Sequence, residues 1–526
     1  MSQLEELRER AQRGVWQEGD ALIIEGLVEC VKTLGQAVDQ KAATIRKLLR
    51  SIFGPSTEKK DNVLKDEEKQ TDDEDNDNSN SSDSTGKPKK KKKRKGHGRN
   101  GAKNYPGAKR VEVKHPDLQK GSACAECIEG KLYPIGFGTE IRITGNAPLQ
   151  ARIYECEKFR CNLCLKIFTA PMPEDAPTSK YDASAAAMIA LLKYGNGMPF
   201  YRIAGLQGSL GIPLPASTQW EQVSDQAKHL KPVLEEFFRQ AAEGELLHND
   251  DTNVKVLSLI EENKKEDPKR KGMFTTGIVS LNGDKKIVLF LSGRKHAGEN
   301  IAEVLSHRDT KEKPPPLQMC DALSRNIPEG FKTILLFCLI HARRYFVDAA
   351  PSFPEECSVV LEILAQVYKF DADTKDGDMS PEERLQYHQE NSGPLMEELG
   401  LWLEEKSHDE NIEENSNLGK AILYMLKYWK KLTVFLRIPN APLDNNICER
   451  ALKKSILHRK NAMFFKNENG AFVGDLYMSL AYTCELAGVN SFEYLVALME
   501  NHKQIEDSPA EWMPWNFKEN LAKMAA

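Results

Sequence analysis

Apolar residues recur at alternating spacings of three and four along the first part of the chain. Starting at Ile24 they form one narrow seam, broken by a single polar residue, Lys41. This heptad pattern predicts a helix over residues 1–54 that pairs with another helix as a coiled coil, so we expect the protein to self-associate. A helix docked on the protein's own core is the alternative. Gly54 and Pro55 end the pattern.

A second helical stretch covers residues 176–245, where apolar positions again follow a helical period. Residues 201–230 read as helix, turn and helix, and we expect Ser217 or Thr218 to cap the second helix. This order resembles a helix-turn-helix, a pattern that is also common in helical bundles. The segment therefore has either a DNA-binding or a packing role.

The pattern changes to that of a sheet at Leu246. Three strand-like runs separated by hairpin-type breaks are followed by a helix, two further strand-like runs and a second helix. This order predicts a mixed sheet covered by helices, and with the flanking segments it makes the fold class multidomain α/β. The expected strands are 246–257, 273–281, 285–293, 317–324 and 332–340, and the expected helices are 297–306 and 341–350.

The rest of the chain is expected to be helical. Residues of about 350–436 predict a helical insertion within the sheet domain. Two apolar helical runs, 475–489 and 491–505, are expected to close that domain. We therefore place the sheet domain with its insertion at 246–480 and a C-terminal helical cap at 481–526.

Charge is segregated along the chain. The 526 residues carry 73 basic and 78 acidic side chains, a net charge of −5 that by itself excludes no partner. Residues 55–110 hold few apolar side chains and change sign midway, from acidic at 66–77 to eight Lys or Arg in nine positions at 87–95. Such a segment cannot bury enough apolar surface to fold, so we expect a disordered linker. The basic half of this segment could touch DNA phosphates, and the acidic half could equally shield the basic half from DNA.

Four of the eleven cysteines form two C-x-x-C pairs separated by 33 residues: Cys124, Cys127, Cys161 and Cys164. Four thiolates at this spacing predict one structural zinc ion in a ribbon at 111–175, in a reducing compartment. The ribbon either contacts DNA or only holds a fold together. Cys156 is left over and is expected to be a small buried apolar residue or an alternative ligand. No signal peptide or membrane helix is visible, so we expect a cytoplasmic protein.

Acidic residues in three places are candidate metal ligands. The first strand contains Asp250 and Asp251, of which only one can face a given site because neighbouring strand positions point to opposite sides. Asp321 lies in the fourth strand, and Glu449 lies on a predicted helix among basic residues. A carboxylate among cations suits a metal beside phosphate, which suggests chemistry on a nucleic-acid backbone. Asn446 and Glu449 alternatively fit a capping box that serves only the helix end.

Basic residues lie close to these acids and are candidates for DNA contacts. Three of them begin the helix after the fifth strand, where they could reach a phosphate or form a solvated helix face: His341, Arg343 and Arg344. Better candidates flank Glu449 on its helix: Arg450, Lys453, Arg459 and Lys460.

Five motifs, taken in order, resemble those of the insertion sequence 66 transposase family: HNDDTNVKVL, SGRKHA, LQMCDALS, CLIHARRYF and PLDNNICERALKKSILHRKNAMFF. The segments LLRSIFGPSTEK, STQW and MPWNF and the paired cysteines also follow that family's plan, so the resemblance covers nearly the whole chain. It implies a ribonuclease-H-like catalytic domain in which Asp250, Asp321 and Glu449 are catalytic and bind two Mg (or Mn) ions. Asp251 replaces the family's usual glutamate, and the residues after Asp321 lack a usual aromatic. Neither change removes a ligand.

The same resemblance implies a DNA transposase. Two metal ions held by carboxylates can position the attacking and leaving oxygens of an in-line displacement at phosphorus, which suits cleavage at the ends of a mobile element and transfer of the freed 3′-hydroxyl to target DNA. The expected partners are the terminal repeats, target DNA, further copies of the chain and helper proteins encoded beside it. Two alternatives remain. One is a DNA-binding protein without catalysis, against which the intact acids argue, and the other is a metal-dependent nuclease that hydrolyses without joining.

Overall fold

The computed structural model describes residues 147–160, 167–174, 176, 179–265, 270–309 and 313–525. The coiled coil expected at 1–54 and the linker expected at 55–110 lie outside these residues. The four cysteines of the expected zinc site also lie outside them: Cys124, Cys127, Cys161 and Cys164. These features stay predictions. In the described part of the chain, no helix is long and apolar enough to cross a membrane.

The described residues divide between two compact units. The smaller unit contains an antiparallel hairpin of β1 (Lys158–Arg160) and β2 (Ile167–Thr169). Cys156 precedes this hairpin and is half-buried, with its thiol 3.7 Å from the sulfur of Met172. The expectation that Cys156 is buried is therefore wrong, because its surroundings in this unit leave part of the side chain open.

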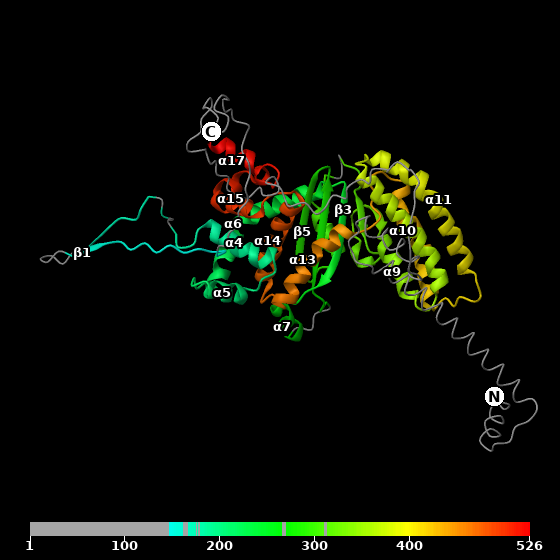
Figure 1. The fold of residues 1–526 in the computed structure, drawn as a ribbon, viewed down its shortest axis with the longest axis horizontal. Coiled ribbons are helices and arrows are strands. Elements are labelled where there is room, and N and C mark those ends of the chain that lie inside the picture. Colours follow the sequence, from blue (N-terminus) through cyan, green and yellow to red (C-terminus); the bar gives the residue numbers. More distant parts are fainter. Residues whose placement is uncertain are drawn as a thin grey trace, which may run out of the picture. The chain divides into compact units, whose positions relative to one another are not determined.

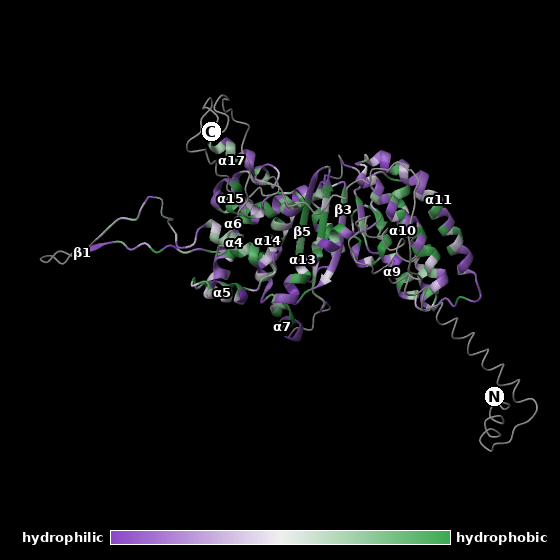
Figure 2. Ribbon diagram, viewed as in Figure 1, coloured by the Kyte–Doolittle hydropathy of each residue, from purple (hydrophilic) through white to green (hydrophobic). Residues whose placement is uncertain are grey.

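The larger unit is built on a five-stranded mixed sheet (Figure 1). Its strands lie in the order β5, β4, β3, β6, β7. The pairs β5–β4 and β4–β3 are antiparallel, and the pairs β3–β6 and β6–β7 are parallel. The strands are β3 (Leu246–Asn253), β4 (Phe274–Asn282), β5 (Lys285–Gly293), β6 (Leu317–Cys320) and β7 (Ile334–Phe337). All five overlap the predicted runs, so the mixed α/β fold is confirmed. In Figure 2 the strands around β5 are mainly hydrophobic, as expected of a sheet covered by helices.

The predicted first strand is wrong beyond Asn253. Instead of continuing to a charged turn, the chain enters helix α7 (Leu257–Lys265). Val256 is fully buried and forms a β-bridge with Phe465, and Leu259 packs in the same small apolar cluster. These contacts come from a distant part of the sequence, and they draw the apolar residues after Asn253 away from the sheet.

Helix α14 (Glu468–Leu486) lies along β5, the edge strand of the sheet. Three α14 side chains at intervals of four residues, Asp475, Ser479 and Thr483, accept hydrogen bonds from alternate N–H groups of β5 at 2.6, 2.9 and 3.0 Å. Unpaired N–H groups on an edge strand can pair with another chain. This helix therefore closes that edge of the sheet.

Helix α6 (Ala216–Ala242) belongs to the larger unit, where the Tyr477 hydroxyl of α14 donates to one of its carbonyls at 2.9 Å. Its N-cap is Pro215, and no side chain caps it, so the expected caps Ser217 and Thr218 are wrong. Both residues lie inside the first turn, because the helix starts before them. The elements that precede α6 are α4 (Ala183–Ala190), the π-helical turn η2 (Leu191–Gly195) and α5 (Phe200–Ser209).

A helical layer shares one apolar cluster with β6 and β7. It consists of α9 (Leu339–Ala349), α10 (Pro354–Asp376), α11 (Pro381–Ser407) and α12 (Asn417–Leu432). Figure 1 shows α9, α10 and α11 on one side of the sheet. A buried ion-pair cluster joins α10 to α11, since Asp371 accepts from Lys375 and Arg384 at 2.6 Å each. Burial opposes ionisation of Asp371, but His388, Arg384 and Lys375 hold its pKa well below the usual range. The carboxylate therefore stays charged and ties the two helices together.

The remaining helices complete the larger unit. Beyond α14 the chain is mainly helical, and the buried Tyr494 hydroxyl donates to the Trp512 carbonyl at 2.7 Å, which ties this end of the chain together. The bounds are α8 (Ala297–Leu305), α13 (Asn446–Ala462), α15 (Ser491–Glu500), α16 (His502–Asp507) and α17 (Phe517–Ala525).

Candidate active site

Asp250 lies on β3, and Asp321 directly follows the neighbouring parallel strand β6. β3 pairs with β6 so that His248 is opposite Met319, and each aspartate comes two residues later. The side-chain period of two then brings both carboxylates to the same side of the sheet. Burial, reinforced by the charge of Asp321, raises the pKa of the Asp250 carboxyl to about 7. The two acids repel each other, so a cation placed between them would be stabilised.

Asp251 points the other way. Its carboxylate accepts from the Thr276 hydroxyl at 2.7 Å and from the Ala297 backbone N–H at 3.0 Å, at the start of α8. Its side chain is fully buried by these contacts. Of the two adjacent aspartates, the structure brings only Asp250 to Asp321.

Glu449 lies in the first turn of α13, and Asn445 fixes that turn to the sheet. The Asn445 side chain donates to the Asn249 carbonyl at 3.1 Å, and its oxygen lies 2.9 Å from Nδ1 of His248. Its backbone N–H also donates to the Cys338 sulfur at 3.3 Å. Three contacts at one residue thus join the start of α13 to the middle of β3 and to the residue that follows β7.

The capping-box alternative for Glu449 is wrong. The N-cap of α13 is Asn445 rather than Asn446, and no side chain caps the helix. Asn446 already lies in the helix, and its side chain donates to Asp444 at 3.0 Å. Because the N-cap is one residue earlier than a capping box with Glu449 requires, Glu449 does not serve the helix end and remains available to the acid cluster.

His341 lies between two of the acids. Its Nδ1 is 2.7 Å from Oδ1 of Asp321, and its Nε2 is 4.0 Å from Oε1 of Glu449. Burial on its own would lower the pKa of this imidazole, but Asp321 and Cys338 raise it to about 10. The charge of His341 also acts on Asp250. Asp321 and Glu449 therefore lie on either side of this imidazole, and Asp250 is within its electrostatic reach.

The cluster contains a buried polar atom that is open to a ligand. Among the described residues, Oε1 of Glu449 has no hydrogen-bond partner, whereas Nδ1 of His341 and Oδ1 of Asp321 face each other at 2.7 Å. Ligand atoms of Cys338, His341 and Glu449 lie within 4.8 Å of one another. Unpartnered buried polar atoms are rare and often mark an ion site, and carboxylate oxygens suit Mg or Mn. The residues present therefore fit a divalent cation.

The basic residues predicted on α13 fall into two groups. Arg450, Lys453 and Lys460 are exposed and, at intervals of three and seven residues, lie on one face of the helix. Arg459 instead donates to the Thr252 hydroxyl at 3.1 Å and to a backbone carbonyl at the end of β3. Its guanidinium therefore fixes the strand that carries Asp250.

The three basic residues predicted on α9 also differ in their exposure and contacts. His341 joins the acids, whereas Arg344 is exposed to solvent. Arg343 is half-buried beside Tyr368, and burial lowers the pKa of its guanidinium. Of the three, Arg344 is the most accessible to a phosphate.

Two further residues of this region are not among the candidates that the sequence suggests. Asn445 is one of them, although a pair of asparagines just before a helix is a visible signal of local anchoring. Cys338 is the other, because a lone cysteine in an apolar strand-like run resembles any core residue.

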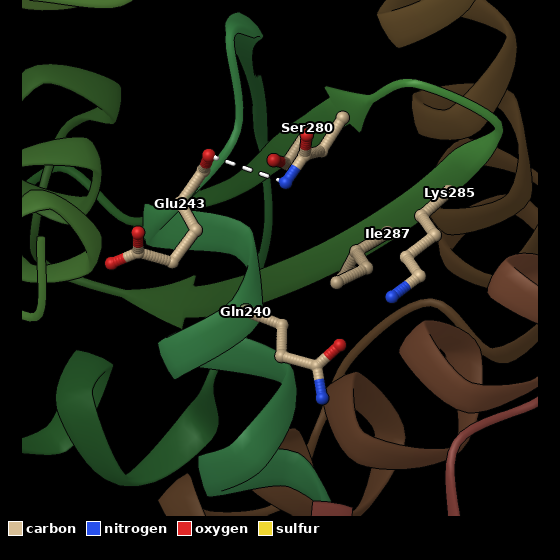
Figure 3. A pocket seen from close by; sticks show the side chains of 6 residues that line it. Gln240, Glu243, Ser280, Lys285 and Ile287 are labelled. Carbon is tan, nitrogen blue, oxygen red and sulfur yellow. Dashed lines mark hydrogen bonds between the residues drawn. The ribbon is translucent and has the colours of Figure 1, made fainter. Parts of the chain in front are cut away.

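A small pocket of about 70 Å³ lies away from the acids (Figure 3). Its lining comes from the end of α6 and from β4 and β5, near the first residues of β3: Gln240, Glu243, Ser280, Asn282, Lys285 and Ile287. None of the three predicted acids lines it. The cavity is too small for more than a few waters, so it offers no site for chemistry on a nucleic-acid backbone.

Comparison with known proteins adds a family to this geometry. A model of the IS66 family of transposases matches residues 178–472, more than half of the chain, including all three acids. The uncharacterized protein y4jD of Sinorhizobium fredii is 27% identical over 77% of this chain and 80% of its own length. The uncharacterized protein y4hP of the same organism is 25% identical over 78% of this chain and 76% of its own length.

Proposed function

We propose that this chain, which belongs to the IS66 family of transposases, cleaves DNA at the ends of an insertion sequence and joins the freed ends to target DNA. The observation that carries the proposal is that Asp321 and Glu449 flank His341, while the charges of Asp321 and His341 both act on Asp250. These acids come from β3, from the residue after β6 and from α13, so only the folded chain brings them together.

The sheet supports a ribonuclease-H-like catalytic domain. Three antiparallel strands are followed by two parallel strands added on the other side of β3, in the order β5, β4, β3, β6, β7. The first acid lies within β3, and the second directly follows the adjacent strand β6. The helical layer interrupts the chain between the second acid and the third. This arrangement supports the ribonuclease-H-like domain that the family resemblance implies.

Asp250, Asp321 and Glu449 would hold two Mg or Mn ions. When bound, such ions supply Lewis-acid activation of the attacking oxygen and neutralise charge on the phosphate. The chain's own residues orient the reactants: Asn445 fixes the helix that carries Glu449, and Arg459 fixes the end of the strand that carries Asp250. Arg450, Lys453 and Lys460 would hold strand phosphates next to the acids.

The reaction has two steps at one site. In cleavage, a water oxygen bonds to phosphorus while the bond from phosphorus to the 3′-oxygen breaks, which leaves a 3′-hydroxyl. In joining, that hydroxyl attacks a target phosphodiester and displaces the target's own 3′-oxygen. Each step exchanges one phosphorus–oxygen bond for another, so positioning and charge neutralisation are the main demands on the protein.

The parts outside the described residues complete the proposal. Cys124, Cys127, Cys161 and Cys164 would bind one structural zinc ion. The heptad seam at 1–54 would pair two copies, which would allow one assembly to hold both ends of the element. Helper proteins encoded by the same element would be further partners.

The test is cleavage and strand transfer on labelled DNA that carries the element's ends, with Mg or Mn. The parent, Asp250→Asn, Asp251→Asn and Glu449→Gln would be compared. We expect Asp250→Asn and Glu449→Gln to bind the ends but to do neither reaction. Asp251→Asn is the matched control, because Asp251 faces α8, and it should keep both reactions.

Three outcomes would contradict this proposal. Unchanged activity in Asp250→Asn or Glu449→Gln would remove these acids from the chemistry. Cleavage by the parent without joining would favour a nuclease. End binding with no reaction under any condition, including addition of the helper proteins, would favour a protein that only binds DNA.

A further inference from the structure

Four aromatic rings form a continuous series beside the candidate active site, which we name the aromatic ladder: Tyr345, Tyr424, Tyr428 and Phe337. The ring centroids of Tyr345 and Tyr424 are 4.6 Å apart, and those of Tyr424 and Tyr428 are 5.0 Å apart. The Tyr428 and Phe337 rings follow at 5.1 Å. These separations are those of directly contacting rings. The ladder joins α9, α12 and the end of β7.

The ladder runs from the core to the surface next to the acids. Phe337 is buried, whereas Tyr345 is 44% exposed. Tyr345 lies one helical turn after His341 on α9, so the two side chains share a helix face. Burial and the neighbouring Tyr345 raise the pKa of Tyr424, and the charge of Asp321 raises it further, which places that ring within electrostatic reach of the acid.

Two lysine side chains lie close to rings of the aromatic ladder. The Lys427 ammonium lies 5.1 Å from the Tyr428 ring centroid, and the Lys431 ammonium lies 4.7 Å from that of Phe337. Both lysines are exposed on α12. Arg344, next to Tyr345, is exposed as well. The surface around the ladder is therefore both aromatic and positively charged.

We propose that Tyr345, the exposed end of the aromatic ladder, stacks on an unpaired base of the DNA strand next to the cleaved phosphate, while Lys427 and Lys431 meet the phosphates of that strand. Aromatic rings bordered by cations bind single strands, because bases stack on the rings while phosphates meet the charges. A paired duplex keeps its base faces covered, so it cannot use an exposed ring in this way. This inference rests on the proposed function, since it places the bound strand relative to Asp321.

A binding experiment with the full chain tests the ladder. The probes are a fluorescein-labelled oligo(dT) of about 20 nucleotides, enough to cover a single-strand site, and a duplex of the same length, at fixed salt. Tyr345→Ala should weaken oligo(dT) binding by roughly five- to a hundred-fold, in line with the loss of one stacked base, and leave duplex binding unchanged. Tyr345→Phe keeps the ring and should bind as the parent does.

Two controls separate stacking from damage to the fold. Leu401→Ala removes another exposed apolar side chain, 70% exposed on α11, and should change neither affinity. Thermal unfolding of each variant should match the parent, because Tyr345 is partly open to solvent. With 2-aminopurine in the oligonucleotide, base fluorescence should be quenched by the parent and by Tyr345→Phe, but not by Tyr345→Ala.

The outcomes distinguish the ladder from the proposed reaction. If the parent fails to bind oligo(dT), or if Tyr345→Ala binds it as the parent does, the ladder is not a base-binding site, even when cleavage occurs. If Tyr345→Ala weakens oligo(dT) binding but the parent cleaves no element ends, the base-binding site stands and the proposed reaction fails.

Discussion

The side-chain oxygen of Asn445 lies 2.9 Å from Nδ1 of His248, across 197 residues of sequence. The Asn445 amide nitrogen donates to the Asn249 carbonyl, so its oxygen must accept, and Nδ1 of His248 carries the proton. Burial lowers the pKa of His248 to about 4, although the Asn445 contact opposes this, and the imidazole is therefore neutral. One buried amide thus joins the strand of the first acid to the helix of the third.

Replacing Asn445 by Ala should disturb catalysis more than it disturbs the fold. The change removes two buried hydrogen bonds and leaves the Asn249 carbonyl and His248 unpaired, at a cost of roughly 1–3 kcal/mol in the free energy of unfolding. It also frees the start of α13, so we expect end cleavage to fall by at least about ten-fold, because small displacements at a reacting centre are costly.

The matched control for Asn445 is its neighbour. Asn446→Ala removes only the side-chain hydrogen bond to Asp444, close to it in the chain, and should leave cleavage within about two-fold of the parent. Equal cleavage by Asn445→Ala and the parent, measured where both are folded, would show that the Asn445 contacts do not position Glu449.

Asp475 makes the stability of the protein depend on pH. Burial raises the pKa of this carboxyl from 3.8 to about 7, although its hydrogen bonds from Ser292 oppose the rise. Between about pH 4 and pH 7 the folded protein keeps a proton that the unfolded chain has lost, so this group makes the free energy of unfolding fall as pH rises. The full effect, reached above pH 7, is on the order of 4 kcal/mol.

Asp475→Asn should remove that dependence. An amide can accept from the Ser292 N–H and donate to the Ser292 hydroxyl, so it replaces the neutral carboxyl without losing a contact. We expect the variant to be more stable than the parent at about pH 7.5 and to lose most of that advantage at about pH 4.5, as measured by urea unfolding. A difference between the two proteins that is the same at both pH values would contradict a raised pKa.

The sequence predicts the sheet because its strands are long runs with clear breaks between them. The parity of strand positions also allows only one of Asp250 and Asp251 to face a given site, and the structure brings Asp250 to Asp321. The role of Asn445 could not be predicted, since its partner His248 lies 197 residues away. Helix α7 could not be predicted for the same reason, because its position depends on the contact of Val256 with Phe465.

Zinc content tests the cysteine motif. We expect about one zinc ion per purified chain and a loss of most of it in the double variant Cys124→Ser, Cys161→Ser, because thiolates supply all four predicted ligands. Cys156→Ser is the control: its thiol lies 3.7 Å from the Met172 sulfur, and the zinc content should not change. Plasma emission spectroscopy gives the metal ratio. Full zinc content in the double variant would exclude this site.

The exposed face of α13 should set the salt dependence of DNA binding. Arg450, Lys453 and Lys460 lie on this face. Each phosphate contact that is lost should reduce the slope of log K against log salt concentration by about 0.9. Replacing all three by Ala should therefore lower the slope for element-end DNA by up to about 3, and weaken binding most at low salt.

Lys454 on the same helix provides the control for that face, because its ammonium is already paired with Glu485 at 2.8 Å. Lys454→Ala changes the net charge by the same amount as one of the other substitutions, but it should leave the slope unchanged. An equal change of slope for Lys454→Ala and Lys453→Ala would mean that DNA responds only to the overall charge of the protein. If the slope changes for Lys453→Ala but not for Lys454→Ala, DNA phosphates contact the exposed face of α13 beside Glu449, where the proposed chemistry needs them.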